Sequence, residues 1–191
     1  MDVNHAAPSV AFGGSGLAIA TPSFDEVYQQ HFDFIWRSAR RLGVETTAVD
    51  DVVQEVFMVV HRKLADTHFD ATVKSWLYGI TVRIVRNHLR SVRRRGPSEE
   101  LPESLIAPGS SPSEAMLRNQ AARVLHAFLD SLDTERREVF VMVDLEQESV
   151  AATATALGIN TNTAHGRLRA ARQELENFLA RRSAAESRRS L

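Results

Sequence analysis

Apolar residues recur at helical spacing along most of the chain. From Phe24 to Leu42 they fall three or four positions apart, and the same spacing returns from about 47 to 64 and from 75 to 94. It resumes near residue 112 and continues through segments at roughly 134–145, 149–157 and 161–180. No segment alternates apolar and polar residues as a half-buried β-strand does. The pattern therefore predicts an all-α protein.

Local signals predict where several of these helices begin and end. Ser23 and Glu26 have the spacing of a capping box, and Gly43 follows the last apolar position of that helix. Pro112 stands where a first helical turn tolerates proline, and Gly158 separates two later helices. We expect side chains that share the apolar faces to be buried, among them Leu77, Ile80, Ile84, His88, Val92, Leu117, Ala121 and Phe128.

Residues 96–112 contain prolines, serines and two glycines without apolar periodicity, which is typical of a linker. We therefore predict two small helical domains, at 23–95 and 113–182, joined by a flexible linker. Residues 1–22 are expected to form a flexible N-terminal tail and 183–191 a C-terminal tail. With no stretch of roughly 20 apolar residues and no signal-peptide pattern, the chain is expected to be cytoplasmic and not inserted in a membrane.

Composition narrows the function. Twenty-three Lys and Arg against 24 Asp and Glu give a net charge of -1, so only a segregated charge distribution would favour nucleic acid. There is no cysteine, the seven histidines have no metal-ligand spacing, and no phosphate-binding glycine loop or nucleophile motif occurs. We expect no catalytic site, no metal and no cofactor.

The charge is indeed segregated on the helix predicted from 75. Between 71 and 95 there are seven basic residues and no acidic one, and Arg83, Arg86, Asn87 and Arg90 share one face opposite the apolar stripe. Such a ridge suits phosphates, although a solvated helix face would have the same pattern. Trp76 and Tyr78 at the start of this helix could stack on an unpaired base or belong to the core.

The preceding helix has an acidic face formed by Asp50, Asp51, Gln54 and Glu55. Acidic residues in a first turn also complement the helix dipole, but Gln54 and Glu55 lie beyond that turn. The face therefore indicates a protein partner.

Residues 149–172 have the spacing of a helix-turn-helix motif, with Ala154 four residues before Gly158. A plain helical hairpin would share the glycine. The second helix offers side chains able to bond base edges and phosphates, namely Thr161, Asn162, Thr163, His165, Arg167, Arg169 and Arg172.

At this point the motifs resemble those of a known family. Asp50-Asp51-Val52-Val53-Gln54-Glu55-Val56-Phe57, Trp76-Leu77-Tyr78 and Asn87-His88-Leu89-Arg90 resemble region 2 of the extracytoplasmic-function (ECF) sigma factors. Arg137-Glu138-Val139, Ala154 to Ile159, Thr163, Arg167-Leu168 and Ala171-Arg172 resemble region 4 of the same family. Together these matches cover almost everything from Phe24 to Leu179.

The resemblance implies an alternative sigma factor that binds core RNA polymerase, recognises minus-35 and minus-10 promoter elements and promotes melting. Its implied partners are the β′ clamp and β flap of polymerase, promoter DNA and an anti-sigma factor that could clamp both domains. Asp51, Gln54 and Glu55 would face the β′ clamp. The minus-10 element would contact Phe69, Lys74, Trp76, Tyr78, Arg83, Arg86, Asn87 and Arg90, and the minus-35 element the seven residues of the second motif helix.

The sequence departs from the family pattern at five positions. Arg83 replaces a common asparagine and Asn87 a usual aspartate, which changes the expected base preference at minus-10. Gly166 stands where serine is common, and Gln147-Glu148 replaces a glycine-containing turn. The main alternative is a helix-turn-helix regulator with a dimerisation or sensing domain, which would bind palindromic duplex as a dimer. A structural interaction protein would leave the arginine face unexplained.

Overall fold

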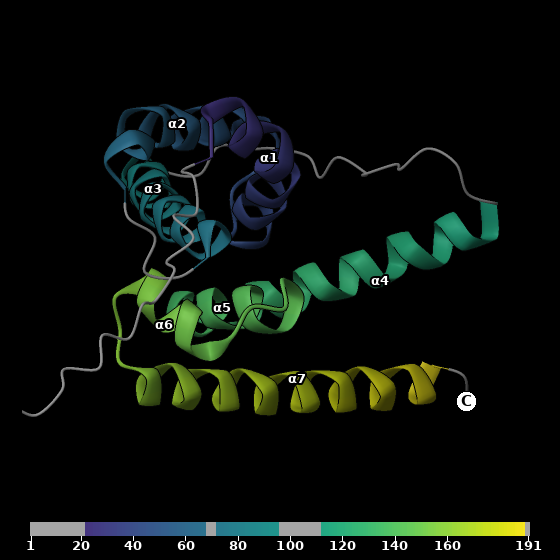
Figure 1. Cartoon of the computed structure of the whole chain (residues 1–191). Helices are drawn as coiled ribbons and strands as arrows, with labels where there is room; N and C mark the ends of the chain where they lie inside the picture. The colour runs from purple at the N-terminus through teal and green to yellow at the C-terminus, as the bar shows by residue number, and fades with distance from the viewer. Residues whose placement is uncertain (1–21, 68–71, 96–111, 190–191) are drawn as a thin grey trace, which may run out of the picture.

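The computed structural model describes residues 22–67, 72–95 and 112–189, and every element in these ranges is helical (Figure 1). The N-terminal domain consists of α1 (Phe24–Arg41), α2 (Thr46–Lys63), a short 3-10 turn η1 (Leu64–Asp66) and α3 (Val73–Arg95). The C-terminal domain consists of α4 (Pro112–Ser131), α5 (Thr134–Phe140), a π-helical turn η2 (Val141–Leu145), α6 (Val150–Leu157) and α7 (Thr161–Arg189). The all-α, two-domain prediction is confirmed.

In the N-terminal domain, α1, α2 and α3 pack pairwise around one core (Figure 1). The capping box at Ser23 is present, with the Glu26 amide bonded to the Ser23 hydroxyl and the Glu26 carboxylate to the Ser23 amide. The valines of α2 are buried, because their helical spacing directs them towards Ile35 of α1 and Leu77 of α3. Helical period thus decides the structure of α2 in spite of its β-branched content.

In the C-terminal domain, α5 and α7 pack closely and α6 packs against the start of α7. Phe128 of α4 is buried with its ring 5.2 Å from Phe140 and 5.7 Å from Phe178. In Figure 1 the free ends of α4 and α7 extend in the same direction beyond the domain. No helix covers those ends within the described part of the chain.

The two domains pack against each other, chiefly through α3 and α6. One continuous cluster of buried side chains includes Val56 and Leu77 of the first domain and Phe140 and Leu168 of the second. The sequence predicted two domains joined by a flexible linker, and it did not predict this contact between them. We call this packing the closed arrangement.

Three expectations for burial and helix length are corrected. Val92 is 38% exposed because α3 runs past the bundle, and Ala121 is exposed because nothing covers that part of α4. The last helix was expected to end near residue 180, but α7 continues to Arg189, so residues 183–189 are helical. The expected burial of Leu117 lies outside the described side chains.

Candidate nucleic-acid interface

The predicted acidic face lies on the surface of α2. Asp51, Gln54 and Glu55 are all exposed. Asp50, predicted to belong to the same face, accepts a 3.0 Å hydrogen bond from the indole nitrogen of Trp36 and so ties α2 to α1. Asp50 is also exposed, but one of its carboxylate oxygens is occupied by this bond, whereas no such bond between helices holds Asp51, Gln54 or Glu55 among the described residues.

An apolar hollow that the sequence did not reveal adjoins this face. Its volume is about 350 Å³, and its lining includes Phe24, Gln54, Phe57, Met58 and His61. Met58 is 55% exposed and lies one helical turn beyond Gln54 and Glu55 on α2. The combined surface offers a partner both carboxylates and apolar contact area.

The predicted basic face lies on α3 as expected, with Arg83, Arg86, Asn87 and Arg90 all exposed. We call these four residues, which were predicted to contact promoter DNA, the promoter face. Arg86 is only partly available, because its guanidinium pairs with the carboxylate of Glu138 from the other domain. This hydrogen bond also raises the pKa of Arg86.

The promoter face is covered on one side by the C-terminal domain. It lines a polar cleft of about 330 Å³ whose opposite wall is the end of α6, from Thr155 to Gly158. Thus the C-terminal domain lies over part of the face that was predicted to hold DNA.

The aromatic and loop residues predicted for minus-10 recognition occupy different environments. Tyr78 is fully buried and its hydroxyl donates a 2.7 Å hydrogen bond to the Glu138 carbonyl oxygen. Trp76 is half-buried against the core. Lys74 lies over the Phe34 ring and bonds Glu146, while Phe69 falls outside the described residues.

The helix-turn-helix geometry is present at α6 and α7. Gly158 ends α6 in the left-handed conformation (φ 66°), and its amide bonds to the Ala154 and Thr155 carbonyl oxygens. The adjoining Ile159 amide donates to the Ala154 carbonyl oxygen at 3.0 Å. Ala154 itself is buried, as expected for the small residue where the two helices touch. The first turns of α7 therefore project from a fixed corner.

Six of the seven predicted minus-35 residues are exposed, namely Thr161, Asn162, Thr163, His165, Arg169 and Arg172. Arg167 is half-buried and pairs with Glu135 at 2.5 Å. Arg172 pairs with Asp144 at 2.6 Å, and this hydrogen bond raises its pKa. Both arginines are thus oriented by acidic neighbours of the same domain, whereas Arg169 projects from the exposed face of α7.

The turn before α6 contains a residue other than glycine in the left-handed backbone conformation. Gln147 has a φ of 60°, a conformation that glycine adopts more readily. Gln147-Glu148 is the pair that replaces a glycine-containing turn of the family pattern. The side chain of Gln147 bonds the Asp144 carbonyl oxygen at 2.7 Å, which supports the turn.

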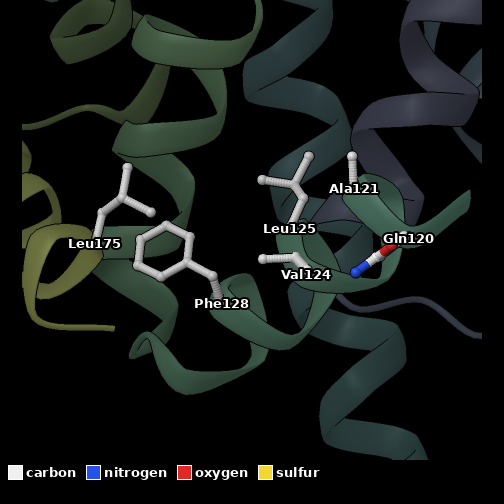
Figure 2. Close-up of a pocket in the computed structure, with 6 residues that line it drawn as sticks. All are labelled: Gln120, Ala121, Val124, Leu125, Phe128 and Leu175. Carbon is white, nitrogen blue, oxygen red and sulfur yellow. The ribbon is translucent and has the colours of Figure 1, made fainter. Parts of the chain in front are cut away.

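An open apolar groove of about 470 Å³ lies between α4 and α7 (Figure 2). Figure 2 shows the Phe128 ring beside Leu175 on one side and Val124 and Leu125 on the other. Leu125 and Val124 are half-buried and so remain partly accessible.

Within the described ranges, no helix combines the length and apolar character needed to cross a membrane.

Comparison with known proteins identifies the family of each domain. The Sigma-70 region 2 family matches residues 27–95 and the Sigma-70 region 4 family matches 122–175. The ECF RNA polymerase sigma factor SigE of Mycolicibacterium smegmatis is 33% identical over 92% of this chain and 68% of its own length. SigM of Mycobacterium tuberculosis is 28% identical over 90% of each chain.

Two solved structures resemble the whole fold. CnrH, solved in complex with the cytosolic domain of CnrY, has a TM-score of 0.62 and 27% identity over 82% of this chain and 87% of that chain. The sigma factor RpoE, solved with the anti-sigma factor NepR from Bartonella quintana, has a TM-score of 0.68. Its identity is 18% over 82% of this chain and 96% of that chain, so this second likeness concerns the fold alone.

Proposed function

The chain belongs to the ECF family of RNA polymerase sigma factors, and from that premise we propose how its surfaces divide the work of transcription initiation. As a sigma factor it acts with core RNA polymerase at promoters. The observation that carries the residue assignment is the charge separation within one domain. An acidic face on α2 and a basic face on α3 are both exposed, although the whole chain is close to neutral.

The α2 surface is the proposed site for the β′ clamp. Asp51 and Glu55 provide two exposed carboxylates one helical turn apart, and the hollow beside Met58 provides apolar area next to them. Interfaces combine such an apolar centre with a polar rim. The open groove beside Leu125 is the proposed site for the β flap, since it is the apolar surface of the C-terminal domain.

The promoter face of α3 is the proposed site for minus-10 DNA. Its three arginines supply charge for phosphates, and Asn87 supplies an amide able to bond a base edge. The exposed start of α7 is the proposed reader of minus-35 DNA, because it is the second helix of a helix-turn-helix corner. The protein itself performs no catalysis in this scheme, and polymerase supplies the chemistry.

We also propose regulation by an anti-sigma factor and a cytoplasmic location, where polymerase and promoters are. The support is that the similar protein CnrH was solved in complex with the cytosolic domain of a second protein, CnrY.

The decisive experiment is a titration of dye-labelled full-length protein into bacterial core RNA polymerase. The wild type is compared with the double variant Asp51→Arg/Glu55→Arg, and Asp33→Arg/Asp66→Arg serves as a control with equal charge change at exposed acids elsewhere in the domain. We expect binding for the wild type and the control and at least about a hundredfold loss for the α2 variant, since a charge reversal at a paired interface costs several kcal/mol. Equal affinity of all three proteins would remove the α2 assignment.

The rival function, a dimeric helix-turn-helix regulator, is separated by the same reagents. It predicts a stable dimer without polymerase and binding to palindromic duplex. Sedimentation of the free protein as a monomer that binds promoter DNA only with polymerase would exclude it.

A further inference from the structure

The two domains approach each other closely at a glycine. An added Cβ on Gly79, in the second turn of α3, would lie 2.6 Å from the backbone carbonyl oxygen of Ala156 in α6. Glycine inside a helix is destabilising relative to alanine, so its presence there needs a reason. The three nearest atoms to that Cβ all belong to Ala156, so the tightest contact at this position comes from the other domain. The closed arrangement supplies the reason.

Two buried acids of the C-terminal domain bind cations of the N-terminal domain. Glu138 is 1% exposed and receives both a hydrogen bond and a salt bridge from Arg86. Glu146 is also buried, and pairs with Arg41 at 2.5 Å and with Lys74 at 3.5 Å. A buried carboxylate requires such partners. Glu138 and Glu146 obtain them from the N-terminal domain in the closed arrangement.

The consequence for DNA follows from what these contacts cover. Arg86 belongs to the promoter face and its charge is neutralised by Glu138. The space left beside Arg83 and Arg90 is a cleft of about 330 Å³, which is the size of a small-molecule site. Duplex DNA cannot lie along the promoter face while α6 forms the opposite wall of that cleft.

We propose that the closed arrangement is an autoinhibited resting state, in which the C-terminal domain occupies the promoter face as an internal substitute for DNA. This inference rests on the proposed assignment of α3 to promoter DNA. Separation of the domains exposes Arg83, Arg86, Asn87 and Arg90 together. Only open molecules bind DNA along this face, so the apparent affinity for DNA is the affinity of the open form multiplied by the open fraction.

The test measures the distance between domains in the full-length protein. Because the chain has no cysteine, Gln30→Cys on α1 and Asn177→Cys on α7 provide the only two thiols for a pair of fluorescent dyes, and both positions are exposed. Gly79→Ala is expected to lower energy transfer, because its Cβ meets a backbone atom that cannot rotate away. Gly166→Ala is the matched control, since it is also a helical glycine but has nothing within 4 Å.

Glu138→Gln is a second variant that removes a charge at nearly constant shape and is also expected to lower energy transfer. In a second arm, core RNA polymerase and a random-sequence duplex library are added to each labelled protein. If about a tenth of the wild type is open, full opening raises the apparent affinity by up to about tenfold.

The outcomes separate the two proposals. Low energy transfer in the wild type, or unchanged transfer in both Gly79→Ala and Glu138→Gln, would overturn the closed resting state. Opening without any gain in affinity for polymerase and DNA would overturn its inhibitory role. If no variant bound polymerase, the proposed function would fail, whereas the measured closure would stand.

Discussion

The Tyr78 hydroxyl of α3 donates a 2.7 Å hydrogen bond to the backbone carbonyl oxygen of Glu138, sixty residues away in the sequence. Tyr78 is wholly buried, and burial raises the pKa of its phenol well above the usual value. The bond therefore joins the two domains through a neutral phenol that stays protonated across the physiological range.

Tyr78→Phe should weaken the closed arrangement with little effect on the N-terminal domain itself. The ring is retained, while one hydrogen bond between the domains is lost at a cost of about 1 kcal/mol; the Glu138 carbonyl oxygen keeps the Val141 amide as a partner. That cost corresponds to a roughly fivefold rise in the ratio of open to closed molecules, measured by energy transfer between the labelled domains. Tyr28→Phe, at an exposed tyrosine of α1, should change nothing.

The Arg86–Glu138 pair should respond unequally to loss of either partner. Arg86→Gln leaves the carboxylate of Glu138 buried without a cation, whereas Glu138→Gln leaves a guanidinium that is 42% exposed and can be hydrated. We expect Arg86→Gln to open the protein more, because separation hydrates the stranded carboxylate. Arg90→Gln on the same face is the control, because no acid within the described ranges pairs with that arginine. Equal opening by Arg86→Gln and Glu138→Gln would mean that Glu138 is hydrated even in the closed protein.

Acidification should open the closed arrangement through His126 of α4. Burial, followed by the charge of Arg40, lowers the pKa of His126. Arg41 and Arg137 act in the same direction and Asp130 opposes them. The closed protein therefore binds fewer protons than the open one. Its stability from this histidine is fully present above the ordinary histidine pKa, about 6.5, and is lost as the pH falls below that value.

An energy-transfer titration from pH 8 to pH 5 checks this expectation. His126→Gln should flatten the pH dependence and His165→Gln, at an exposed histidine, should not. The comparison also isolates His126 from His31, whose pKa burial lowers as well. A His126→Gln variant with the full wild-type dependence would rule out the residue as the source.

Phe128→Ala should destabilise the C-terminal domain by about 3–5 kcal/mol, because it removes a buried ring that contacts Phe140 and Phe178. Both tryptophans, Trp36 and Trp76, lie in the N-terminal domain, so their fluorescence reports that domain separately. In urea, circular dichroism should show early loss of helix while the fluorescence transition moves less. Equal shifts in both signals would mean that the domains unfold as one cooperative unit.

Local chemistry made most of the fold predictable. The capping box at Ser23 and the left-handed Gly158 depend on a few neighbouring residues, so their sequence signals were sufficient. Burial at the free ends of helices was not predictable in this way. Val92 and Ala121 continue an apolar face, but whether a face is covered depends on where distant helices lie.

The candidate site was predicted as separate surfaces, and the structure brings two of them together. Exposure of Asp51, Glu55, Arg83 and Arg90 follows from helical period alone. The meeting of α3 with α6 does not, because it depends on the relative position of two domains joined by a linker. Gly79 within a helix, and Glu138 among buried neighbours, were the available signals of that contact.

Position 79 should behave asymmetrically in a genetic selection. Glycine is the smallest residue, so every missense change there adds at least a Cβ against the Ala156 carbonyl oxygen. Substitution at position 79 can therefore weaken the contact between α3 and α6 but cannot strengthen it. A selection for variants that favour the open protein should recover many different residues at position 79. A selection for variants that favour the closed protein should recover none there.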